Sequence, residues 1–323
     1  MEKRRSVLLI GFGVVLLTLS LIPFVHAQKE YPTRPIEIVC PYPPGGANDM
    51  LMRAVVAVGG QYLGQPLIPA IRSGAAGTVG AAFVARSRPD GYTIFIASTT
   101  PLTTKPLVEK LPYKSEDFIP IGQLSASPMI IHVLASAPWK SLKEFIEDAK
   151  KSPGKFRYST AGVYEPEHLS FEALSQMAGI KLIHVPMGGG GPALAAMLGG
   201  HVETVANFPS VVSPHITGGT VRPLAVTSAE RLKAKGLEGI PTLKELGFDH
   251  ENYMWIGIFV PKGTPPEIVQ KLRTVVKQIS DDPSFQGLMV RMGEQIRYMS
   301  GEDFEKYWKR EQTTIGELIK IIK

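Results

Sequence analysis

Residues 41–49 of this chain are Pro41-Tyr42-Pro43-Pro44-Gly45-Gly46-Ala47-Asn48-Asp49. They follow the apolar run 36–40 and precede an apolar-periodic stretch from Met50, an order that predicts a strand, a proline-stiffened turn and the start of a helix. Two glycines beside a helix N-terminus leave backbone N–H groups uncovered, with the positive end of the helix dipole behind them. Such a loop suits a carboxylate or another anion. The alternative is a plain strand-to-helix turn.

The first 27 residues have the pattern of a secretory signal peptide. Three basic side chains lie within residues 2–5, the run 6–25 is uncharged, and Val25-His26-Ala27 places small residues where a signal peptidase cuts. The alternative is an uncleaved membrane anchor, because the apolar run approaches the length of a spanning helix. Pro23 and Ala27 favour cleavage after Ala27, and hence export.

The mature chain is long enough for two domains of ordinary size, since 296 of the 323 residues follow Ala27. Loss of the leader removes three basic residues and one acidic residue, which lowers the formal net charge from +6 to +4. The basic residues form no stripe with interleaved aromatics, so we expect no nucleic-acid partner. Cys40 is the only cysteine; it excludes an internal disulfide and is expected to be a buried hydrophobe.

Short β-rich runs alternate with helical patterns, which predicts an α/β architecture with largely parallel sheets. The predicted strands are 36–40, 66–71, 92–97, 129–134, 156–159, 181–185, 202–206, 221–227 and 253–260. Ser141, Thr242 and Thr264 each precede a glutamate by three residues and predict capped helix starts. Ser300 and Asp303 predict the start of a last helix that runs toward Lys323.

No low-complexity linker or internal repeat divides the chain, so the domain boundary must come from the order of the strands. Around residues 127–128 and again around 249–253 the chain passes between blocks of strands. Two such crossings make the first domain discontinuous. We expect lobe 1 to comprise residues 28–128 plus 252–323 and lobe 2 to comprise 129–251, with a cleft between them.

Several motifs occur in the order that one known family shows. They are Tyr31-Pro32-Thr33-Arg34-Pro35-Ile36 before the 41–46 turn, Arg72-Ser73-Gly74-Ala75-Ala76-Gly77-Thr78-Val79-Gly80 with Pro89-Asp90-Gly91-Tyr92-Thr93, His184-Val185-Pro186, Gly189-Gly190-Gly191-Pro192-Ala193-Leu194, Leu198-Gly199-Gly200-His201-Val202, Leu224-Ala225-Val226-Thr227-Ser228, Pro241-Thr242-Leu243-Lys244-Glu245 and Pro261-Lys262-Gly263-Thr264-Pro265. With these motifs in register over essentially the whole mature chain, the sequence resembles the substrate-binding proteins of tripartite tricarboxylate transporters, the Bug family.

This resemblance implies a periplasmic binding protein fold of type II, in which two α/β lobes close on a small ligand. The implied ligand is an aliphatic or aromatic organic acid with one, two or three carboxylates, and no cofactor is implied. The implied partners are the membrane permease subunits of a tripartite tricarboxylate transporter. A freely diffusing receptor is most simply a monomer.

The resemblance also assigns ligand-binding positions. The first loop supplies Tyr42, Pro44, Gly45, Gly46, Ala47, Asn48 and Asp49, and the backbone N–H groups of this loop, with ordered water, hold one carboxylate. The segment after the third strand supplies Ser98, Thr99 and Thr100. The opposite lobe supplies Thr160, Ala161, Tyr164, Glu165, Met187, Gly188 and Asn207.

Departures from the family pattern concern the ligand. Tyr164 and Glu165 add bulk and a negative charge where a small polar loop is common. Met187 and Gly188 stand where tyrosine and lysine are usual. Asn207 stands where aspartate is frequent, and its amide does not fix the ligand charge.

The sequence favours a binding protein over an enzyme. It contains no Gly-x-Ser-x-Gly, no His-Glu-x-x-His and no motif that pairs cysteine with histidine. His168 with Glu165 and Glu167 is the one local cluster of possible metal ligands, and acidic residues are ordinary at a helix start. We expect no catalytic residue and no metal. The alternatives are a periplasmic sensor or interaction protein of the same fold and, as the minor one, a hydrolase with a triad assembled in space.

Overall fold

The computed structural model describes residues 31–45, 47–292 and 294–322. The predicted signal peptide and the predicted site residue Gly46 lie outside these residues. Within the described part of the chain, no helix is both long enough and apolar enough to cross a membrane.

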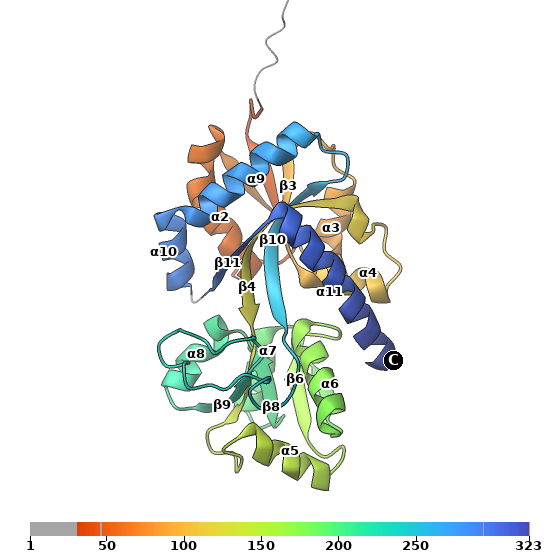
Figure 1. The fold of residues 1–323 in the computed structure, drawn as a ribbon, viewed down its shortest axis with the longest axis vertical. Helices are drawn as coiled ribbons and strands as arrows, with labels where there is room; N and C mark the ends of the chain where they lie inside the picture. The colour runs from red at the N-terminus through yellow and green to blue at the C-terminus, as the bar shows by residue number, and fades with distance from the viewer. Residues whose placement is uncertain (1–30, 46, 293, 323) are drawn as a thin grey trace, which may run out of the picture. The chain divides into compact units, whose positions relative to one another are not determined.

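Two mixed sheets organise the chain (Figure 1). The six-stranded sheet has the order β11-β4-β10-β3-β1-β2, with bounds Ile296–Ser300, Phe118–Pro128, Tyr253–Pro261, Thr93–Ser98, Ile36–Cys40 and Leu67–Ile71. The five-stranded sheet has the order β7-β6-β8-β5-β9, with bounds Ile183–Pro186, Arg157–Thr160, Thr204–Asn207, Ile130–Leu134 and Val221–Val226. An α/β fold is confirmed.

The prediction of largely parallel sheets is wrong, because each sheet contains antiparallel pairs. Strand β10 pairs antiparallel with both β3 and β4, and β5 pairs antiparallel with both β8 and β9. The pairs of β1 with β2 and β3, and of β6 with β7 and β8, are parallel. The antiparallel strands β4, β5 and β10 flank the two places where the chain changes sheet.

The helices fill the connections between these strands. They are α2 (Ala47–Leu63), α3 (Thr78–Ala85), α4 (Lys105–Val108), α5 (Leu142–Lys151), α6 (Pro166–Ala178), α7 (Gly190–Leu198), α8 (Pro209–Thr217), α9 (Pro266–Asp281), α10 (Pro283–Arg291) and α11 (Gly301–Ile322). Short 3₁₀ turns cover Ala75–Gly77 and Ser115–Asp117, and a π-helical turn covers Thr100–Thr104.

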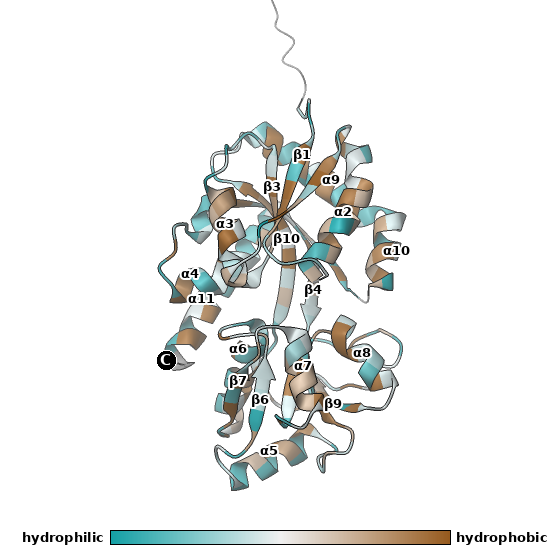
Figure 2. Ribbon diagram, turned by 180° about the vertical axis from the view of Figure 1, so that it is seen from behind, coloured by the Kyte–Doolittle hydropathy of each residue, from teal (hydrophilic) through white to brown (hydrophobic). Residues whose placement is uncertain are grey.

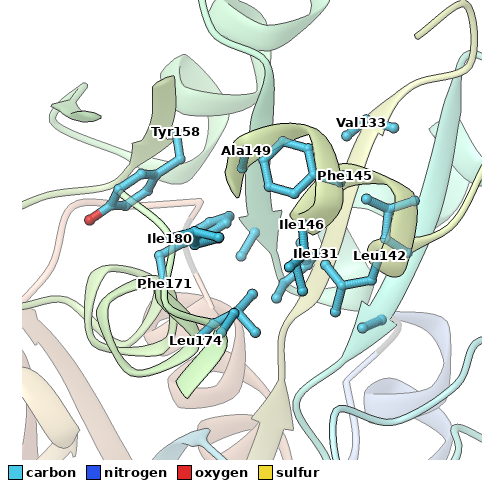
Figure 3. Close-up of a cluster of buried hydrophobic side chains, with 14 of the residues drawn as sticks. Ile131, Val133, Leu142, Phe145, Ile146, Ala149, Tyr158, Phe171, Leu174 and Ile180 are labelled. Carbon is cyan, nitrogen blue, oxygen red and sulfur yellow. The ribbon is translucent and has the colours of Figure 1, made fainter. Parts of the chain in front are cut away.

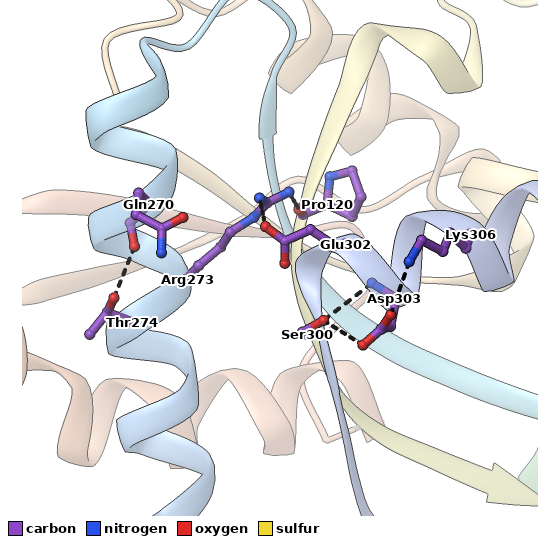
Figure 4. A network of polar contacts seen from close by, with 8 residues as sticks. All are labelled: Pro120, Gln270, Arg273, Thr274, Ser300, Glu302, Asp303 and Lys306. Atoms are coloured by element: carbon purple, nitrogen blue, oxygen red, sulfur yellow. Dashed lines mark hydrogen bonds and ion pairs between the residues drawn. The ribbon is translucent and has the colours of Figure 1, made fainter.

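Two of the four predicted helix caps are confirmed. Ser141 accepts a hydrogen bond from the Glu144 N–H at 3.2 Å, and Ser300 accepts one from the Asp303 N–H at 3.2 Å. Figure 4 shows the second cap beside Arg273 of α9, which joins Glu302 and the Pro120 carbonyl oxygen.

The other two predicted helix starts are wrong, although the capping hydrogen bonds predicted for one of them are present. The Thr264 hydroxyl donates to the Pro261 carbonyl oxygen at 2.8 Å, and α9 begins only at Pro266. Thr242 and Glu245 do exchange hydrogen bonds of 3.0 and 2.9 Å, but they close a single turn. Gly247, with φ +90°, ends that turn, and the Phe248 N–H returns to the Leu243 carbonyl oxygen.

Each sheet packs on its own aromatic core. Figure 3 shows the core below the five-stranded sheet, where Phe145, Tyr158 and Phe171 are fully buried. The six-stranded sheet buries Trp255, and Figure 2 shows frequent apolar positions on β1 and β3. Cys40 is a free, buried thiol as expected, and burial raises its pKa to about 11.

Candidate functional site

The ends of β1 and β3 bring the first two predicted segments together. These strands are parallel neighbours, so the residues that follow Cys40 and Ser98 emerge at one edge of the sheet. The Ser98 hydroxyl donates to the Tyr42 hydroxyl oxygen at 3.4 Å, and the Tyr42 hydroxyl donates to the Ala76 carbonyl oxygen at 3.4 Å. Burial raises the pKa of Tyr42, and the charge of Glu165 adds to that rise. Tyr42 is therefore a neutral hydroxyl in the site.

Asp49 shapes the first loop from inside the helix start. Its carboxylate is 2% exposed and accepts hydrogen bonds from the Gly45 N–H at 2.9 Å and from Arg53 Nε at 3.0 Å. Burial opposes ionisation, but these two donors outweigh it and hold the pKa of Asp49 below its usual value. The expectation of an uncovered N–H group is therefore wrong for Gly45, because a carboxylate of the chain already accepts that bond.

Other polar groups of this loop are still able to form hydrogen bonds with a ligand. Ala47 and Asn48 are the first helical residues, so their N–H groups have no acceptor inside the helix. Among the described residues, Asn48 Oδ1 and Asp49 Oδ1 are buried without a hydrogen-bond partner. Pro44 and Gly45 are exposed. The loop thus combines a fixed shape with unfilled hydrogen-bonding positions.

The segment after β3 meets the opposite sheet. The Thr100 hydroxyl donates to Glu165 Oε2 at 2.6 Å, and Glu165 directly precedes α6 in the other half of the chain. Ser98, Thr99 and Thr100 are all buried, and Thr99 Oγ1 has no partner among the described residues. This bond joins two predicted site segments that lie far apart in the sequence.

The remaining predicted segments gather at the ends of β6, β7 and β8. Thr160 donates to the Gly162 carbonyl oxygen at 2.9 Å, and the Met187 N–H donates to the Thr160 carbonyl oxygen at 3.0 Å. Asn207 Nδ2 donates to the Gly190 carbonyl oxygen at 3.1 Å, and Asn207 Oδ1 lies 3.1 Å from His132 Nε2. Asn207 therefore connects the start of α7, through its amide nitrogen, with His132 of β5, through its amide oxygen.

Tyr164 lies apart from the other predicted site residues. Its backbone has φ +62°, and its N–H donates to His168 Nδ1 at 3.0 Å. Its side chain packs against the apolar cluster of Leu169, Ile315 and Ile319. Tyr164 therefore covers the contact between α6 and α11, and no described hydrogen bond links it to Tyr42 or Thr100. Ala161 belongs to the same loop as Tyr164, whereas Met187, which precedes Gly188, packs against a different apolar cluster that includes Leu194, Met197 and Val205.

A stack of aromatic rings beneath the 161–165 loop escaped the sequence analysis. The His168 and His184 rings lie 4.1 Å apart between centroids, and the Tyr158 ring stacks on His184 at 4.9 Å. Burial lowers the pKa of His168 and of His184 to about 4. The register that pairs Tyr158 with His184 was the available signal, since it places both rings on one face of the sheet. Among the described residues, no group of three potential ligands could hold a metal ion.

This histidine pair predicts an acid-sensitive site. Because the pKa of each ring is depressed in the folded protein, the unfolded chain binds protons first as the pH falls from about 6.5 to 4, so stability falls across that window. We expect His168→Gln, whose amide oxygen can still accept from Tyr164, to reduce the fall in melting temperature between pH 6.5 and pH 4. The exposed His201→Gln is the control. Equal pH slopes for wild type and His168→Gln would contradict the assignment.

A separate hollow of about 450 Å³ lies beside the contact between α6 and α11, and Leu169 and Ile315 of that contact also line it. Its lining includes Asn252, Tyr253, Arg297, Arg310 and Leu318. None of the predicted site residues that the structure describes lines it. It is therefore a second place where a small molecule could be sought.

Comparisons with known proteins agree with one another. A family model described as "Tripartite tricarboxylate transporter family receptor" matches residues 51–323. Protein BugT of Bordetella pertussis is 32% identical over 276 residues, covering 84% of this chain and 83% of BugT. A TctC solute binding protein from Polaromonas, solved without ligand, is 37% identical with a TM-score of 0.78, covering 90% of this chain and 99% of that one. The R. palustris protein Rpa4515, solved with adipate, is 30% identical with a TM-score of 0.80, covering 90% of this chain and 98% of that one.

Proposed function

Because the chain belongs to the tripartite tricarboxylate transporter receptor family, we propose that it is a periplasmic solute-binding receptor for a small organic carboxylate. The observation that carries the proposal is the convergence of the predicted segments. The first loop contacts Ser98, Thr100 contacts Glu165, and Met187 contacts Thr160. The adipate bound by the relative Rpa4515 supports the ligand class.

The proposed ligand site lies between two lobes, residues 28–128 with 252–323 and residues 129–251. The distribution of strands supports this division, because the six-stranded sheet takes its strands from before Met129 and after Asn252. The chain changes sheet between Pro128 and Ile130 and again between Val226 and Tyr253. These two connections are the proposed hinges.

Within that site, backbone donors and hydroxyls orient the ligand. The N–H groups at the start of α2 face one carboxylate, supported by the positive end of the helix dipole. Tyr42, Ser98 and Thr99 supply hydroxyls from the first lobe. The glycine-rich start of α7 supplies donors from the second lobe, positioned by Asn207. Charge-assisted hydrogen bonds of this kind provide orientation as well as binding energy.

Closure of the lobes converts occupancy into a shape that a permease recognises. A ligand shifts the open–closed equilibrium only through its higher affinity for the closed form. The Thr100–Glu165 bond belongs to the closed form, since its partners come from different lobes. Delivery to the permease subunits of a tripartite transporter, after cleavage of the leader behind Ala27, completes the proposal. The proposed role needs no catalytic residue.

A thermal-shift screen of the mature protein, starting at Gln28, tests this function. The panel contains acetate, benzoate, succinate, adipate and citrate, amino acids, and uncharged amides as controls. A ligand that binds only the folded protein raises the melting temperature by mass action. We expect a saturable shift with at least one carboxylate class and none with the amides. Cooperative unfolding without any shift, and without a co-purified small molecule by mass spectrometry, would favour a sensor or interaction protein instead.

A further inference from the structure

Two carboxyl groups lie together on the first turn of α6. Glu165 precedes the helix and Glu167 is its second residue. Glu167 is 3% exposed, and its Oε2 atom has no hydrogen-bond partner among the described residues. The charge of Glu165 acts directly on Glu167. An unfilled, deeply buried oxygen therefore lies next to the bond that joins the two lobes.

Little positive charge faces this pair. Lys105 of α4 acts on Glu165, but its ammonium group lies 2.5 Å from Glu109 and is engaged there. From the first loop, Tyr42 faces Glu165 with a neutral hydroxyl. Within the described part of the chain, neither Glu165 nor Glu167 has an ion-pair partner. Among the described residues, the two adjacent carboxyl groups thus have only the more distant charge of Lys105, shared with Glu109, to offset them.

Two such groups cannot both be ionised at low cost. Burial, followed by the charge of Glu165, raises the pKa of Glu167 to about 8, and burial also raises the pKa of Glu165. Near neutral pH one of the two groups therefore keeps its proton. An anionic ligand in the same site adds a further negative charge and strengthens that preference. A protonated carboxyl group can also donate a hydrogen bond, and Glu167 Oε2 has no partner among the described residues that already takes this place.

Lobe closure would control this protonation. Glu167 is buried, Glu165 is half-buried, and Thr100 of the first lobe covers Glu165. Separation of the lobes would remove that cover, and access of water would lower the pKa of Glu165 and Glu167 toward the ordinary value of about 4.3.

We propose that Glu165 and Glu167 form a proton site, so that the protein binds its carboxylate ligand together with one proton taken from the solution. This inference rests on the proposed receptor function. The two glutamates then select for an anionic ligand, because each anion is bound together with one proton in the closed site.

The sign of the pH dependence follows from the two states. A group whose pKa is about 8 in the closed form and about 4.3 in the open form takes up a proton when the lobes close, at any pH between these two pKa values. Affinity is therefore highest at the acid side of this window and falls by up to about tenfold for each pH unit between about pH 5.5 and pH 7.5. Above about pH 9 the uptake disappears, since both forms have lost the proton.

Calorimetric titration in pairs of buffers with different ionisation enthalpies tests the proposal directly. The probe is adipate, or succinate or benzoate if that carboxylate gives the larger thermal shift. At pH 7 we expect an uptake close to one proton per bound anion, and at pH 9.5 close to none. Glu167→Gln should abolish the uptake at pH 7 and remove the pH dependence of the affinity. Glu172→Gln, on the same helix but beside Tyr158, is the matched control and should keep both.

The outcomes separate this inference from the receptor function. Saturable binding of the anion without proton uptake overturns the proton site and leaves the receptor function intact. Glu294 is another buried carboxyl group, and it joins the two halves through Ser127 and Ser210. If Glu294→Gln abolishes the proton uptake while Glu167→Gln keeps it, the proton site is overturned and the receptor function again stands. Tight binding of amino acids alone, without uptake, would mean that the glutamates are ionised and face an ammonium group. Absence of any carboxylate binding overturns both proposals.

Discussion

Trp255→Ala is expected to lower the free energy of unfolding by about 3–5 kcal/mol, the usual range for a fully buried tryptophan. Trp255 is 0% exposed, and its ring packs against Phe304, Phe259 and Trp308 at centroid distances of 5.0, 5.7 and 6.2 Å. Its Nε1–H donates to Glu311 at 2.7 Å. The substitution therefore opens a cavity and also removes a donor from a buried carboxyl group. Urea denaturation followed by circular dichroism measures the loss.

Two comparisons make this prediction specific. Val290→Ala, at a position that is 76% exposed, should change the free energy of unfolding by only a few tenths of a kcal/mol. Trp255→Phe, which keeps most of the ring packing, should lose less than Trp255→Ala. If Trp255→Ala unfolds at the same urea concentration as wild type, the core assigned to the six-stranded sheet is wrong.

Asp49→Ala is expected to weaken carboxylate binding by about 10- to 100-fold, because hydrogen bonds to a charged group contribute about 1.5–3 kcal/mol. The substitution releases the Gly45 N–H and Arg53 from their common acceptor, so the first loop loses the contact that fixes its shape. Removing a negative charge by itself would favour an anionic ligand. We expect the loss of shape to outweigh that gain, because Arg53 already neutralises the Asp49 charge in the folded protein.

Calorimetry on the folded variant decides between these two effects. Lys143→Ala is the control, since both side chains of the Lys143–Glu147 ion pair are exposed, at 83% and 55%, and exposed ion pairs contribute little; it should leave the affinity unchanged. An increase in affinity for Asp49→Ala would mean that its charge, and not the loop that it holds, governs the site.

The local sequence pattern was sufficient to predict a strand wherever its run of apolar residues is uninterrupted. All nine predicted strands overlap a strand of the structure, within one or two residues at each end. Strand β4 was missed because Pro120, Gly122 and Pro128 interrupt its apolar pattern, and proline is normally excluded from a central strand. The structure accommodates them with register shifts between β4 and β10. Pairing with a distant strand therefore overrides the local pattern.

The site was predictable in its segments but not in its contacts. The resemblance placed Tyr42, Thr100 and Glu165 on loops at the ends of strands, and the structure brings these three together. It could not indicate that Asp49 takes the Gly45 N–H or that Tyr164 packs toward α11, because both depend on helix geometry and on contacts between distant elements. The sequence indicated Glu167 as one of a cluster of possible metal ligands or as an ordinary acidic residue at a helix start, and it could not indicate that the side chain is buried, since burial is a property of the folded chain.

The most direct test of the receptor function is a crystal structure of the mature chain grown with a carboxylate that shifts its melting temperature. We predict density for the anion between the start of α2, the hydroxyls of residues 98–100 and the Glu165 loop, with one carboxylate hydrogen-bonded to backbone N–H groups of the first loop. Density for the anion only in the hollow lined by Arg297 and Arg310, with the segments around Tyr42 and Glu165 unoccupied, would contradict the account.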